Sequence, residues 1–116
     1  MKLLYAIIQP HRLEPVRQAL ARIGVERMTV CDAQGFGRQR GHTEMYRGHE
    51  YQIALVRKIM LEIAVNDDFI ARTIDAIRSQ ALTGPDGNIG DGKIFVMPLE
   101  ETFDIASGSR GKPAIN

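Results

Sequence analysis

Two glycine-rich segments carry most of the residues in this chain that could hold an anionic ligand. The first, from Gly35 to Tyr51, contains four glycines, three arginines and two tyrosines, with almost no aliphatic side chains. The second runs from Thr83 to Gly92 and is followed by Lys93. Backbone N–H groups in glycine-rich turns form anion-binding concavities, so both segments are candidate phosphate sites. The second is not a Walker A motif, because Ile94 stands where that motif needs a hydroxyl.

The sequence offers few side chains for catalysis. The histidines lack metal-ligand spacing to the single cysteine, and no serine or cysteine has an evident general base. Glu44 and Asp86 are the only carboxylates that could orient a water near a terminal phosphate, which leaves a weak ATPase as the enzyme alternative. We therefore predict a binding protein that is not an enzyme. A structural assembly with a vestigial site is a third possibility.

Length and composition exclude several classes of protein. The chain has 116 residues, of which 44% are hydrophobic, enough for one domain with a real core. The formal net charge of +1 gives no indication of a nucleic-acid partner, and no apolar run approaches the roughly 20 residues needed to insert into a membrane. Cys31 is the one cysteine, which excludes an internal disulfide and fits a reducing compartment. We expect a cytoplasmic protein.

Hydrophobic periodicity predicts an α+β domain over residues 1–106, followed by a flexible tail at 107–116. Strands are expected at 3–9, 28–32, 53–65 and 93–98, and amphipathic helices at 13–23 and 69–81. Asn66 is a candidate N-cap, Gly24 a candidate C-cap, and Cys31 is expected to be a small buried residue. The order βαββαβ predicts a ferredoxin-like fold with helices on one face of an antiparallel sheet.

Several motifs together resemble the PII signal-transduction proteins. The resemblance covers about residues 1–100 and is carried by Gly35-Phe36-Gly37-Arg38-Gln39-Arg40-Gly41-His42-Thr43-Glu44, Tyr46-Arg47-Gly48, Glu50-Tyr51, and Ile89-Gly90-Asp91-Gly92-Lys93-Ile94-Phe95-Val96. It also includes Ala6-Ile7-Ile8, Pro10, Met28-Thr29-Val30, Lys58 and Glu62. The resemblance implies a homotrimer that binds adenine nucleotide, ATP or ADP, in clefts between subunits. Mg²⁺ and 2-oxoglutarate can bind with the ATP.

The resemblance also implies roles for individual residues. Phosphate-side residues would be Gly35, Gly37, Arg38, Gln39, Gly90, Asp91, Gly92 and Lys93. Adenine- and ribose-side residues would be Ile7, Met28, Thr29, Glu62, Ile63 and Ala64. Gln39 would contact the magnesium of Mg-ATP, and Gln39 and Lys58 would contact 2-oxoglutarate. A T-loop at about 37–55 would dock on a target, such as a membrane transporter or a metabolic enzyme, and Tyr51 matches the tyrosine uridylylated in many relatives. A B-loop would span about 83–92.

The chain departs from the family pattern in two places. The loop that usually reads Thr-Gly-Lys-Ile-Gly-Asp-Gly-Lys is three residues longer here, and Asn88 stands where a lysine is usual. Asp104 and Ala106 occupy positions where the family has phosphate-clamping arginines. Either Arg110 and Lys112 of the tail replace those arginines, or the ligand is ADP or AMP, with a small anion such as bicarbonate, outside nitrogen control. On these grounds the sequence is interpreted as a divergent paralogue.

Overall fold

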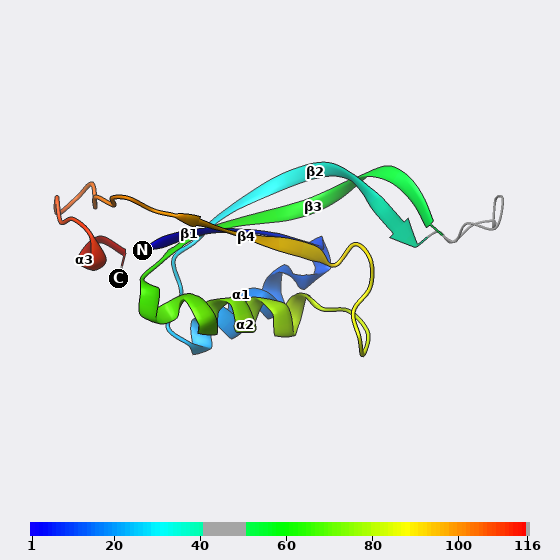
Figure 1. The fold of residues 1–116 in the computed structure, drawn as a ribbon, viewed down its shortest axis with the longest axis horizontal. Helices are drawn as coiled ribbons and strands as arrows, with labels where there is room; N and C mark the ends of the chain where they lie inside the picture. Colours follow the sequence, from blue (N-terminus) through cyan, green and yellow to red (C-terminus); the bar gives the residue numbers. More distant parts are fainter. Residues whose placement is uncertain (41–50, 116) are drawn as a thin grey trace.

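One antiparallel sheet with helices on a single face forms the body of the molecule (Figure 1). The computed structural model describes residues 1–40 and 51–115, with side chains described outside 38–40 and 51–53. The elements are β1 (Lys2–Ile8), η1 (Pro10–Arg12), α1 (Leu13–Arg22), β2 (Thr29–Arg40), β3 (Tyr51–Val65), η2 (Asp67–Phe69), α2 (Ile70–Ala81), β4 (Gly92–Pro98) and α3 (Lys112–Ile115). The sheet order β2-β3-β1-β4 confirms the predicted ferredoxin-like arrangement.

The core lies between the sheet and the helices α1 and α2. Alternate residues of β1 and β3 point into it, because successive side chains of a strand face opposite sides. The buried set is Leu4, Ala6, Ile8, Val16, Ala19, Leu20, Ile59, Leu61, Ile63, Val65, Ile77 and Ala81. Each of these positions follows the strand or helix periodicity of the sequence, and each predicted helix boundary lies within one residue of the observed one.

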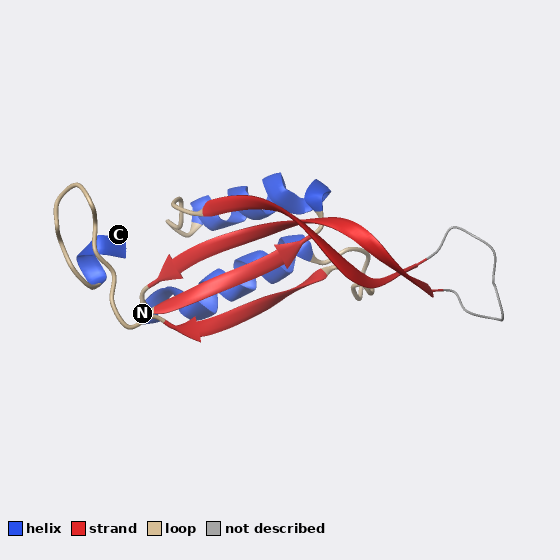
Figure 2. Ribbon diagram, turned by 90° about the horizontal axis from the view of Figure 1, so that it is seen from above, coloured by secondary structure: helices blue, strands red, loops and turns tan. Residues whose placement is uncertain are grey.

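Apart from the end where Ile115 of the tail approaches Ala64, the opposite face of the sheet is not covered by any described element (Figure 2). Leu3, Tyr5 and Met60 are half-buried there, and Phe95 is 50% exposed. Cys31 lies on the same face opposite Met60 and is half-buried rather than fully buried as predicted. An apolar sheet face without a cover is a surface on which another polypeptide can pack.

The strands β2 and β3 extend beyond the helices as a long two-stranded arm. The prediction that the second strand ends at Asp32 was wrong, because pairing continues from Thr29 opposite Glu62 to Arg40 opposite Tyr51. Glycine has low strand propensity, but the backbone of β3 supplies the hydrogen bonds of the ladder whatever the side chains are. Gly35 and Gly37 therefore lie in a strand rather than in a loop.

Two local predictions have different outcomes. Gly24 ends α1 with a φ of +85°, as expected of a C-cap glycine. Asn66 precedes η2 without a side-chain capping hydrogen bond. Its buried Nδ2 instead donates to the Lys112 carbonyl at 3.4 Å, so this residue ties the tail to the end of β3.

The segment after β4 forms a small hairpin and the helix α3, next to the N-terminus (Figure 1). Phe103 bridges to Arg110, whose guanidinium carbon lies 4.8 Å from the centre of the Phe103 ring and which pairs with Glu101 at 2.9 Å. The flexibility expected from the tail's composition stays a prediction. Among the described helices, none is long and apolar enough to cross a bilayer.

Candidate functional site

A pocket of about 390 Å³ lies where the two glycine-rich segments meet. Its lining comes from β1, the base of the arm, and the beginning of β4 with the loop before it. The lining residues are Ile7, Gly35, Phe36, Gly37, Val56, Lys58, Ile89, Gly90, Gly92, Lys93 and Phe95. We call this set the glycine–lysine pocket. It brings together six of the predicted nucleotide-side residues, and its volume is in the range of small-molecule sites.

The glycines of the pocket differ in whether the fold of the chain requires glycine at that position. Gly92 has a φ of +123°, and a Cβ there would lie 1.7 Å from the Ile7 carbonyl oxygen, so the fold itself demands glycine. A Cβ added at Gly35 or Gly37 would meet nothing within 4 Å. The packing of the described chain therefore does not explain these two glycines. Glycine inside a strand often marks a place where a ligand approaches the backbone closely.

Among the described side chains, two lysines supply the positive charge of the pocket. Lys93 is exposed at the start of β4. Lys58 is half-buried, and its Nζ donates a hydrogen bond to the Gly90 carbonyl. Burial lowers the pKa of Lys58, while the charge of Asp91 opposes that shift. The ammonium of Lys58 thus joins the arm to the loop before β4 at the edge of the pocket.

Five other predicted nucleotide residues lie nearer the tail, at or beside the ends of β2 and β3. None of Met28, Thr29, Glu62, Ile63 and Ala64 lines the glycine–lysine pocket. Along β3, Glu62 is six positions from Val56, about 20 Å in an extended strand, but only four positions from Lys58. Across the sheet, Tyr5 pairs with both Glu62 and Phe95, so Phe95 of the pocket lies two strands from Glu62. The predicted residues therefore form two groups that adjoin each other on the sheet.

The second group presents different kinds of surface. Thr29 is exposed and Met28 packs partly against the core, whereas the Ile63 side chain is fully buried, so only its backbone could meet a ligand. Glu62 is half-buried beside Tyr5, and its hydrogen bond and charge raise the pKa of the Tyr5 hydroxyl. We call Met28, Thr29, Glu62 and Ala64 the tail-side set, because the tail lies at this end.

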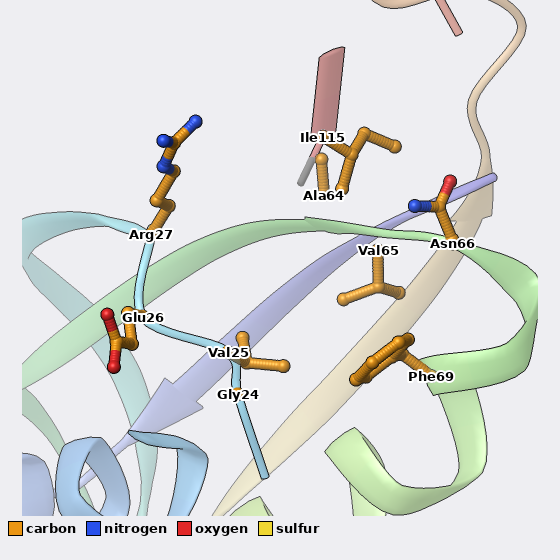
Figure 3. Close-up of a pocket in the computed structure, with 9 residues that line it drawn as sticks. All are labelled: Gly24, Val25, Glu26, Arg27, Ala64, Val65, Asn66, Phe69 and Ile115. Atoms are coloured by element: carbon orange, nitrogen blue, oxygen red, sulfur yellow. The ribbon is translucent and has the colours of Figure 1, made fainter. Parts of the chain in front are cut away.

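A second cavity, of about 250 Å³, adjoins the tail-side set (Figure 3). The turn at 24–27, the end of β3, Phe69 and Ile115 of α3 line it. Figure 3 shows Val25, Val65 and Phe69 grouped together, with Ile115 of the tail on the far side of β3 from Phe69. Sequence reasoning did not identify this cavity, because its walls come from four segments that only the fold brings together.

Three predicted residues cannot be placed by their side chains. Those of Arg38, Gln39 and Tyr51 lie outside the described set, so the predicted magnesium contact and the modification site stay predictions. Glu44 lies outside the described residues altogether. Within residues 1–40 and 51–115, no group of three or more His, Cys, Asp or Glu side chains could hold a metal ion.

Comparison with known proteins identifies the family. The model of the family described as nitrogen regulatory protein P-II matches residues 1–109. Over 115 residues, the chain is 49% identical to the nitrogen regulatory protein P-II of Bradyrhizobium diazoefficiens, covering 99% of this chain and 100% of that one. The nitrogen regulatory protein GlnK1 of Methanosarcina mazei is 47% identical, over 99% of this chain and 97% of that one.

A solved structure supports the same assignment. The crystal structure of Arabidopsis thaliana PII bound to citrate superposes with a TM-score of 0.76 at 32% sequence identity, and the match covers 98% of this chain and 88% of that one. Sequence, fold and family model therefore agree over nearly the whole length. The chain belongs to the nitrogen regulatory protein P-II family of signalling proteins.

Proposed function

We propose that this protein is a non-enzymatic signal transducer that binds an adenine nucleotide, ATP or ADP, in clefts between the subunits of a homotrimer. It acts in the cytoplasm. The glycine–lysine pocket takes the phosphates, and the tail-side set of the next subunit takes the adenine and ribose. The nucleotide, with Mg²⁺ and 2-oxoglutarate where they bind, sets the conformation of the T-loop at about 37–55. The T-loop then docks on a target protein, such as a membrane transporter or a metabolic enzyme.

The observation that carries the proposal is the pair of glycines whose surroundings are open. Gly35 and Gly37 leave free space in front of their backbone, in a pocket that Lys58 and Lys93 also line. Lysines are common partners of phosphate, and a glycine-lined wall lets an anion approach backbone groups. The pocket therefore fits the phosphates of a nucleotide.

Two features favour a site shared between subunits. Thr29 is six positions from Gly35 along β2, about 20 Å in an extended strand, so Thr29 and the glycine wall of one chain cannot touch the same phosphate. The sheet face that bears Tyr5, Met60 and Phe95 is uncovered and partly apolar. In a cyclic assembly, packing this face on copies of itself would place the pocket of one chain beside the tail-side set of the next.

The tail bears on how many phosphates the site holds. The carboxylate of Asp104 accepts hydrogen bonds from the Ser107 hydroxyl at 2.7 Å and from the Ser107 backbone N–H at 2.9 Å. These bonds lower the pKa of Asp104. Arg110 pairs with Glu101, and Lys112 lies 3.7 Å from Asp68. Since both tail cations already face carboxylates of their own chain, these contacts favour ADP or AMP over ATP as the tighter ligand.

Calorimetric titration of the purified protein with ATP, ADP and AMP, with and without Mg²⁺ and 2-oxoglutarate, tests the proposal. We expect saturable binding of one nucleotide per subunit, and no release of phosphate from ATP. The variant Lys93→Met should bind more weakly than Arg22→Met, a control that removes a positive charge from the outer face of α1. Absence of nucleotide binding, or equal loss in both variants, would contradict the assignment.

A further inference from the structure

The loop between α2 and β4 is closed by a single carboxylate. Asp91 accepts hydrogen bonds from the backbone N–H of Thr83 at 3.0 Å and from that of Asn88 at 2.8 Å. It also accepts one from the Thr83 hydroxyl and one from Gln9 Nε2 at 3.3 Å. Four donors from three residues thus converge on one side chain.

Asn88 completes this closure from the other side. Its Nδ2 donates to the carbonyl and to the hydroxyl of Thr83, each at 3.0 Å, while its own carbonyl accepts from the Asp91 N–H at 3.2 Å. Both ends of the 83–91 loop are therefore cross-linked through Thr83, Asn88 and Asp91. The additional residues of the loop lie within this closed ring.

Asp91 faces away from the glycine–lysine pocket. Gly90 and Gly92 line that pocket, whereas Asp91 between them lines a different groove, against α2. Burial works to raise the pKa of Asp91, but the hydrogen bonds from Thr83 and Asn88 and the charge of Lys58 outweigh burial and lower it. The carboxylate therefore stays ionised, which would repel phosphate if it pointed into the pocket.

We propose that Asp91 is a positioning residue of the nucleotide site: it holds the 83–91 loop closed from behind, so that Gly90, Gly92 and Lys93 form a fixed wall for the phosphates. This inference rests on the proposed nucleotide-binding function. It differs from the role implied by the family resemblance, in which Asp91 stands among the phosphate-side residues. Lys58, bonded to the Gly90 carbonyl, fixes the same loop from the pocket side.

Three variants test the proposal. Asp91→Ala removes the acceptor for all four donors. Thr83→Val removes one hydroxyl with little change in shape, and Thr83→Ser retains that hydroxyl as the matched control. The first readout is amide hydrogen exchange of residues 83–92 in the ligand-free protein, which needs no nucleotide. The second is the affinity for ADP, by calorimetry, with and without Mg²⁺.

The expected results are specific to positioning. Asp91→Ala should accelerate exchange in the loop and weaken ADP binding about tenfold or more, by the same factor with and without Mg²⁺. Thr83→Val should do so to a smaller extent, and Thr83→Ser should match the wild type. In the Asp91→Ala background, Thr83→Val should add less than it does alone, because the hydroxyl has already lost its acceptor.

Other outcomes would overturn the inference. Loss of affinity only when Mg²⁺ is present would make Asp91 a metal contact, and unchanged exchange would show that it does not close the loop. If Asp91→Ala does not fold, the two Thr83 variants still test the inference. Equal hydrogen exchange and equal ADP affinity in Thr83→Val and Thr83→Ser would exclude a role for the hydrogen bond from the Thr83 hydroxyl to Asp91. If the wild type binds no nucleotide, the proposed function and the positioning role both fail. Hydrogen exchange of the ligand-free protein still tests separately whether Asp91 closes the loop.

Discussion

The two ends of the sheet are built in different ways. At the glycine–lysine pocket, the backbone is fixed by a glycine that no other residue can replace, Gly92, and by a loop cross-linked through Asp91. At the tail-side end, Thr29 is exposed and the adjoining segment is held by local contacts such as the Arg110–Glu101 pair. One end is a pocket with an ordered backbone and two lysines, and the other is a more open surface around the exposed Thr29.

This difference agrees with the proposed site, in which each of two chains supplies one kind of surface. A preformed site for phosphate loses little entropy on binding, because its backbone is already ordered. A purine ring needs apolar and backbone contacts instead, and the tail-side set offers these through Met28 and Ala64. Under the proposed function, the pocket of one chain and the tail-side set of the next therefore hold different parts of the ligand.

The largest expected effect separates two kinds of glycine. Gly92→Ala should destabilise the fold by more than about 3 kcal/mol, because the added methyl would collide with the Ile7 carbonyl and because its φ disfavours other residues. Gly35→Val should leave the melting temperature close to that of the wild type, yet abolish nucleotide binding by filling the open space. Thermal unfolding and calorimetry on both variants check this. If Gly92→Ala and Gly35→Val lower the melting temperature equally, the fold requires both glycines, and the open space at Gly35 no longer supports a ligand there.

The next effect concerns the charge of the pocket. Lys93→Met should weaken ADP binding by about tenfold to a hundredfold, the size expected for one charge-assisted hydrogen bond to phosphate. AMP should lose less than ADP if Lys93 contacts the second phosphate. Titration of both ligands into wild type and variant measures the difference. An identical loss of affinity for the two nucleotides would indicate that Lys93 contacts the first phosphate. Unchanged affinity for both would show that Lys93 is not part of the site.

A smaller effect should appear in the pH dependence of binding. Burial lowers the pKa of Lys58, so this ammonium loses its proton at lower pH than an ordinary lysine as the solution becomes alkaline. Nucleotide affinity should therefore begin to fall below the usual lysine range. Lys58→Arg should flatten the decline, because arginine remains charged. Affinity measured in alkaline buffers checks this, and a wild-type profile identical to that of the variant would contradict it.

The smallest effect belongs to the tail. Arg110→Gln should shift the melting temperature only slightly, because the Arg110–Glu101 pair is exposed and solvent screens it. If Arg110 instead replaces a missing phosphate-clamping arginine, the same variant would lower ATP affinity much more than AMP affinity. Calorimetry with both nucleotides separates a structural tail from one that reaches the ligand.

Much of the fold could be predicted from the sequence because the hydrophobic residues of most elements follow the strand or helix period. The alternation at Ile59, Leu61, Ile63 and Val65 identifies β3, and helical spacing identifies α1 and α2. The length of β2 could not be predicted, since Gly35 and Gly37 carry no strand signal and pair only because β3 lies beside them. Long-range pairing overrides local propensity in such segments.

The site was predictable only in part, for a related reason. The glycines and Lys93 could be identified as anion-binding candidates by composition, and the family resemblance named the remaining residues. That Asp91 turns away from the pocket depends on hydrogen bonds from Gln9, Thr83 and Asn88, which no spacing rule reveals. The cavity next to Ile115 likewise needs four segments in place at once.

The most direct test of the central claim, that each site joins two subunits, is complementation between variants. Lys93→Met damages the pocket, and Thr29→Trp blocks the exposed tail-side set. Each trimer made from one variant should bind ADP poorly, and sedimentation should confirm that each still assembles. Mixed trimers, purified through two different tags, should regain about one tight site each, where an intact pocket meets an intact tail-side set. If mixed trimers bind no better than either parent, the site lies within one chain and the account is wrong.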